Sequence, residues 1–147
     1  KFLIEDGRLV KFKQFTNAKR LAGNVVSTAR TYEDLCVDEM YFCDLGVIDP
    51  AMIRDVTADV FTPVTVAGSI HSMGQVNELI RDCGVDKIVV KDRELGKAVA
   101  QKYGRQAVVW PIDYHTLCVE DVPDCAGEIL LTDIDRDGLG KGLTWTY

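Results

Sequence analysis

The sequence predicts an α/β fold: a partial TIM-type (β/α)8 barrel of about six βα units with parallel strands. Three segments, residues 36–42, 83–90 and 125–131, share one plan of a helix end, a charged residue and a short apolar strand. Two further apolar runs, 63–67 and 106–110, lie between them, so strands begin roughly every 20 to 24 residues, the span of one βα unit. Acidic residues follow several strands, and the carboxyl ends of parallel strands form the functional face of such folds.

The length and the charge of the chain restrict its class. We expect one domain over residues 1–147, because no linker or low-complexity segment divides it. A complete eight-unit barrel takes about 250 residues, so we expect units to be missing. A net charge of −6 without a basic run argues against nucleic acid as a partner, whereas a phosphorylated metabolite needs only local positive charge. We expect no membrane span and no signal peptide, which predicts a cytoplasmic protein.

The sequence also predicts a strand and a hairpin at the start of the chain, and two helices in its first half. Residues 2–4 form the first strand, Asp6-Gly7 predicts a turn, and the alternation over residues 9–15 predicts a hairpin extension of the first loop. We expect a helix over about 25–35. A second helix is expected from Pro50, which is favoured in a first turn, to about Asp59.

The second half contains two helices with clear signals and one weak one. Ser72 and Asp92 predict the N-caps of helices that end near Gly84 and at Gly104. Between the last two strands only residues 114–126 remain, interrupted by a proline, so at most two helical turns fit there.

The cysteines and histidines give little sign of a metal or cofactor, and we expect neither. His71 and His115 both follow strands and could touch a ligand, but without a paired acid or nucleophile they are interpreted as ordinary loop residues. Five cysteines include no C-x-x-C pair and predict reduced thiols packed in the core: Cys36, Cys43, Cys83, Cys118 and Cys125.

Two turns after strands are candidate sites. Gly68 and Ser69 offer small residues and free amides that could cradle a phosphate, although a tight turn needs glycine for steric reasons alone. Residues 133–138 match the first half of a calcium-binding EF-hand loop, but position twelve is Thr144 and a strand precedes them. We therefore expect a βα loop with one or two functional acids.

Three charged residues open alternate strands of the predicted barrel. Glu39, Lys87 and Glu128 would contribute to one layer of interior side chains, where their alternating signs would meet at the amino-terminal mouth. The alternative is that they are three separately solvated charges.

Five segments of the chain resemble, in order, the cyclase subunit of imidazole glycerol phosphate synthase: residues 6–11, 38–44, 65–70, 106–113 and 127–138. The resemblance implies a (β/α)8 barrel that receives ammonia from a glutaminase partner. It implies that the enzyme closes an imidazole ring while splitting a bis-phosphorylated carboxamide nucleotide.

The resemblance also implies roles for individual residues. Asp113 and Asp137 match catalytic positions, and Glu39, Lys87 and Glu128 match members of a charged gate for ammonia. Lys11 and Gly68 match substrate-loop and phosphate positions, and Thr132 matches a residue of the active face. Ser69 is a candidate of the same phosphate turn, although the family has glycine there.

The chain departs from the family pattern at Leu3, where the family has its second catalytic aspartate, and at Lys91, where it has asparagine. Leucine at the first position resembles a divergent branch associated with amidation of sugars in bacterial surface polysaccharides. This leaves two alternatives: an ammonia-handling protein that works beside an amidotransferase, or a non-catalytic scaffold that self-associates into a homo-oligomer to cover its open edges.

Overall fold

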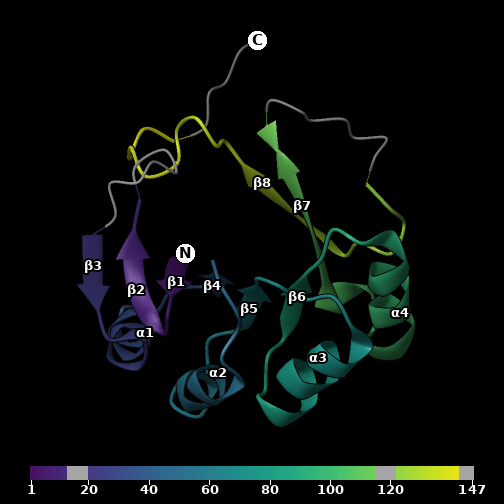
Figure 1. Ribbon diagram of the computed structural model, residues 1–147, viewed down its shortest axis with the longest axis horizontal. Helices are drawn as coiled ribbons and strands as arrows, with labels where there is room; N and C mark the ends of the chain where they lie inside the picture. Colours follow the sequence, from purple (N-terminus) through teal and green to yellow (C-terminus); the bar gives the residue numbers. More distant parts are fainter. Residues whose placement is uncertain (13–19, 115–121, 143–147) are drawn as a thin grey trace.

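A computed structural model describes residues 1–12, 20–114 and 122–142, and shows one curved sheet with helices along its outer face (Figure 1). The strand order is β3-β2-β1-β4-β5-β6-β7-β8. Six strands run parallel, which confirms the predicted α/β fold and partial barrel. These strands are β1 (Phe2–Glu5), β4 (Met40–Asp44), β5 (Val64–Ala67), β6 (Lys87–Val89), β7 (Val108–Asp113) and β8 (Glu128–Thr132).

Four capped helices connect the parallel strands. The side chains of Asn24, Asp49, Ser72 and Asp92 each accept a hydrogen bond from an amide in the first turn, which confirms the two predicted caps and adds two. The third helix differs from its prediction because it changes to a π-helical turn over Glu78–Asp82. The helices are α1 (Val25–Asp34), α2 (Pro50–Thr57), α3 (Met73–Asn77) and α4 (Arg93–Tyr103), and none of these is long and apolar enough to cross a membrane.

A hairpin extends the sheet beyond β1. Strand β2 (Arg8–Lys11) pairs antiparallel with β1, and β3 (Arg20–Gly23) pairs antiparallel with β2. Asp6 and Gly7 both have positive φ, 51° and 69°, as the predicted turn of a two-residue hairpin requires. Of the predicted strand over 9–15, the described part ends at Lys11, and residues 13–15 lie outside the described residues. Strand β3 was not predicted.

The connection between β7 and β8 contains no α-helix in its described part. Residues 122–126 form turns, in which the Ala126 amide donates to the Pro123 carbonyl at 3.0 Å. The rest of the expected helix, with His115 and Cys118, lies outside the described residues. On the outer face of β8, Ile129 is 52% exposed.

The two faces of the sheet differ in what packs against them. Side chains that alternate outward pack against the helices, and among them Phe42 is fully buried and stacks on Phe2 with ring centroids 4.6 Å apart. On the inner face, Ala67, Val89 and Val109 form a small separate cluster. The inner face also carries polar side chains, among them Thr65, Lys87 and Glu128.

We expect Phe42→Ala to lower the free energy of unfolding by about 3–5 kcal/mol, because it opens a cavity in the packed outer layer. Phe61→Ala is the matched control, since this side chain is 97% exposed, and it should change stability by less than about 0.5 kcal/mol. Urea unfolding followed by circular dichroism measures both. Equal effects would contradict the packing of Phe42 in the core between the sheet and the helices.

Candidate functional site

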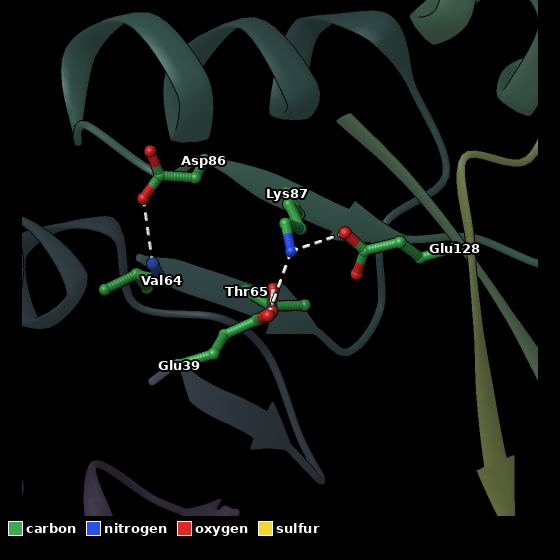
Figure 2. A network of polar contacts seen from close by, with 6 residues as sticks. All are labelled: Glu39, Val64, Thr65, Asp86, Lys87 and Glu128. Carbon is green, nitrogen blue, oxygen red and sulfur yellow. Dashed lines mark hydrogen bonds and ion pairs between the residues drawn. The ribbon is translucent and has the colours of Figure 1, made fainter. Parts of the chain in front are cut away.

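A charged cluster stands at the amino-terminal ends of the strands, on the inner face (Figure 2). Lys87, the first residue of β6, places its Nζ 2.9 Å from Glu39 Oε2 and 2.6 Å from Glu128 Oε1. Glu39 directly precedes β4 and Glu128 opens β8. The structure thus brings together the three residues that the sequence places on alternate strands.

Hydrogen bonds from the sheet fix the cluster. Thr65 of β5 donates its hydroxyl to Glu39 Oε1, and the Val64 amide donates to Asp86 Oδ2 at 2.8 Å (Figure 2). The Lys87 side chain is the least exposed of the three ionised groups, at 18% against 35% for Glu39 and 46% for Glu128. The cation is therefore enclosed between two more accessible carboxylates, which is the arrangement that an inward lysine needs.

The protonation of the cluster reflects this enclosure. Burial opposes the charge of both central groups, yet the hydrogen bonds from Thr65 and Lys87 hold the pKa of Glu39 below its ordinary value. Burial likewise acts against Lys87, but hydrogen bonds with Glu128 and Glu39 and their charges raise the pKa of the Lys87 amine. Both shifts favour the ionised pair.

The stability that the cluster provides should therefore depend on pH. The lowered pKa of Glu39 gives stabilisation that is present above its ordinary value of 4.5 and is lost as pH falls through the folded-state pKa. The raised pKa of Lys87 gives stabilisation that is present below 10.5 and is lost only as pH rises through the folded-state value.

We expect wild type to exceed Lys87→Met in unfolding free energy by about 1 kcal/mol at pH 7, and the difference to vanish as the pH is lowered towards 2. Urea titrations across this range measure it. Lys97→Met is the control, because Lys97 pairs with Glu94 on the exposed face of α4. A difference that persists in acid would exclude a contribution from the ionised cluster.

The candidate acids lie at the opposite ends of the strands. Asp113 ends β7, Thr132 ends β8, and the two residues are paired in the sheet. Both line a cavity of about 180 Å³ that also contains Leu3 and Lys91. Thr132 lines a neighbouring cleft of about 470 Å³ together with Asp137. The structure therefore brings Asp113, Thr132 and Asp137 around two adjoining hollows.

The loop after β8 connects the two sides of the open sheet. It returns across the sheet towards β1 and β2 (Figure 1), where Asp137 Oδ2 accepts a hydrogen bond from Lys1 Nζ at 2.7 Å. A third cleft, of about 400 Å³, is lined by Asp137, Leu3 and Lys11. Lys11 is therefore within the same region as the candidate acids.

Gly68 and Ser69 lie at the end of β5 and line none of these three hollows. Gly68 has φ of 155°, and a Cβ there would stand 2.9 Å from the Ile48 side chain, so glycine is required for packing. The Ser69 hydroxyl donates to the Gly46 carbonyl at 3.0 Å. Their role in phosphate binding stays a prediction.

Sequence reasoning missed Tyr41, which lines both the cavity with Asp113 and the cleft with Asp137. The signal was present, because Tyr41 lies two residues after Glu39 and so shares its face of the strand. Burial first, and then Cys43 and Asp137, raise the pKa of the Tyr41 phenol.

The two remaining candidates from the sequence are His71 and the loop over 133–138. His71 is exposed, and its backbone amide donates to Gln75 Oε1. Within residues 1–12, 20–114 and 122–142, no three histidine, cysteine, aspartate or glutamate side chains are placed to hold a metal ion, so the loop over 133–138 shows no such arrangement.

Known proteins match most of the chain. The family of histidine biosynthesis proteins matches residues 2–123. Imidazole glycerol phosphate synthase subunit HisF from Chlorobium luteolum is 34% identical, over 95% of this chain and 68% of its own length. The subunits HisF from Streptococcus mutans and Mycobacteroides abscessus are 32% and 34% identical, over 95% and 97% of this chain and 68% and 60% of their own lengths.

This chain is shorter than the stretch over which it matches its relative. The match to the Chlorobium luteolum protein runs over 174 positions, whereas this chain has 147 residues, so the relative carries additional residues inside the matched region. The order of strands and the extent of the match lead to one conclusion. This chain belongs to the family of histidine biosynthesis proteins.

Proposed function

We propose that the chain is an ammonia-dependent cyclase of the imidazole glycerol phosphate synthase type, acting on a bis-phosphorylated carboxamide nucleotide. One observation carries the proposal. A single inner face has an ion-pair cluster at the amino ends of its strands, Lys87 with Glu39 and Glu128, and carboxylates at the carboxyl ends. An enzyme that receives ammonia at one end of its strands and binds a phosphorylated substrate at the other needs different polar groups at the two ends.

In this proposal Asp113 transfers protons. Asp113 ends strand β7 and lines a cavity. Thr132, its partner in the pairing of β7 with β8, lines the same cavity and is a second polar side chain there. Asp137 assists from the adjoining cleft, and Lys11 offers the positive charge that a phosphate requires. Gly68 and Ser69 hold a phosphate through backbone amides at the end of β5.

The ammonia enters past Lys87, Glu39 and Glu128, and a glutaminase subunit supplies it. Lys87 bridges the two carboxylates at 2.9 and 2.6 Å, so a small neutral molecule passes only when one of these contacts opens. The carboxylates are partly exposed, and an exposed ion pair contributes about 0–1 kcal/mol, which makes opening inexpensive.

We expect Asp113→Asn to lower ammonia-dependent turnover of the nucleotide by 100-fold or more, because it removes the proposed proton carrier without changing the size of the side chain. Turnover is measured spectrophotometrically with ammonium chloride and no partner. Asp55→Asn, exposed on α2, is the control and should retain full activity. Activity retained in Asp113→Asn would exclude the cyclase proposal.

We expect Lys87→Glu to abolish complex formation with the glutaminase subunit of imidazole glycerol phosphate synthase. Three carboxylates would then repel one another at the amino ends of the strands, which is the docking end that we propose for this subunit. Light scattering after size-exclusion chromatography measures the complex. Lys97→Glu, on the exposed face of α4, should bind like wild type. An undiminished complex with Lys87→Glu would count against this docking end.

Leu3 supports a second, narrower candidate function. It lines the cavity of Asp113, where it places an apolar side chain beside the proposed acid, as in the branch associated with amidation of surface polysaccharides. That branch, the self-associating homo-oligomer and a cytoplasmic location stay predictions.

A further inference from the structure

One polar group of the inner face has no part in the proposed function. Tyr41 is the second residue of β4, and the proposed function gives its hydroxyl no role. Met40 and Phe42 on either side are 1% and 0% exposed against the helices, so Tyr41 projects to the opposite, inner face. Tyr41 packs there against the cluster of Ala67, Val89 and Val109.

Tyr41 links the two hollows that hold the candidate acids. It lines the cavity of Asp113 and also the cleft of Asp137, and it shares this position with Lys1, Leu130 and Thr132. Acceptor oxygens of a substrate bound between these acids need hydrogen-bond donors from other side chains. A phenol reaching both hollows supplies such a donor without adding charge.

We propose that the Tyr41 hydroxyl is a substrate-binding group that donates a hydrogen bond to an acceptor oxygen, of the carboxamide or sugar class, held between Asp113 and Asp137. This inference rests on the proposed function, because the same hollows must hold the substrate. Burial, and then the neighbouring Cys43 and Asp137, raise the pKa of Tyr41, so the phenol keeps its proton at neutral pH.

The experiment compares Tyr41→Phe with wild type in ammonia-dependent turnover of the nucleotide. Phenylalanine keeps the ring and its packing and removes only the hydroxyl, so kcat/KM should fall about 10- to 100-fold while the melting temperature stays nearly constant. Tyr103→Phe is the matched control: its hydroxyl donates to Asn77 at 2.7 Å, away from both hollows, and kcat/KM should not change.

Incorporation of 3-fluorotyrosine at position 41 restores the hydroxyl and should restore at least half of the activity. It also serves where Tyr41→Phe does not fold, since loss of activity in the fluorinated protein would overturn the inference. An active wild type with an equally active Tyr41→Phe overturns the inference and leaves the proposed function intact. An inactive wild type overturns the proposed function, and the inference with it.

Discussion

The register of six parallel strands is the constraint on which the rest of the structure depends. Parallel pairing aligns the strands side by side, and the two-residue alternation then sends successive side chains to opposite faces. The outward set is apolar and is buried against the helices, as Phe42 and Val66 are. The inward set is consequently free to be polar, and a slip of one residue would turn Lys87 into the helix layer and Ile88 inward.

An inward lysine imposes its own requirement on the sheet. Desolvation penalises the ammonium of Lys87, and two carboxylates with a threonine hydroxyl behind one of them compensate for it. The strands that supply Glu39 and Glu128 must therefore stay in register with β6. The cluster thus ties β4, β6 and β8 together at their amino ends, whether or not ammonia passes through it.

Local signals in the sequence predicted most of the fold, and long-range packing explains what they missed. The caps at Ser72 and Asp92 and the meeting of Glu39, Lys87 and Glu128 follow from spacing and from barrel geometry. Strand β3 lacks an alternating pattern, since it reads Arg-Leu-Ala-Gly, and the π-helical turn over Glu78–Asp82 has no known local signal. The need for Gly68 comes from Ile48, a residue of another loop, and the place of Tyr41 appears only when two hollows meet around it.

The loop after β8 joins the two ends of the run of parallel strands through one ion pair. Strands β1 and β8 stand at the two ends of the run of parallel strands, yet Asp137, in the loop after β8, pairs with Lys1, which directly precedes β1, and lines a cleft together with Leu3 of that strand. Both side chains of this pair are about 30% exposed, at 31% and 29%, so the ion pair contributes about 0–1 kcal/mol. Asp137 also lines the cleft that Tyr41 and Thr132 line. One residue of this loop therefore takes part in the clefts at both ends of the run of parallel strands.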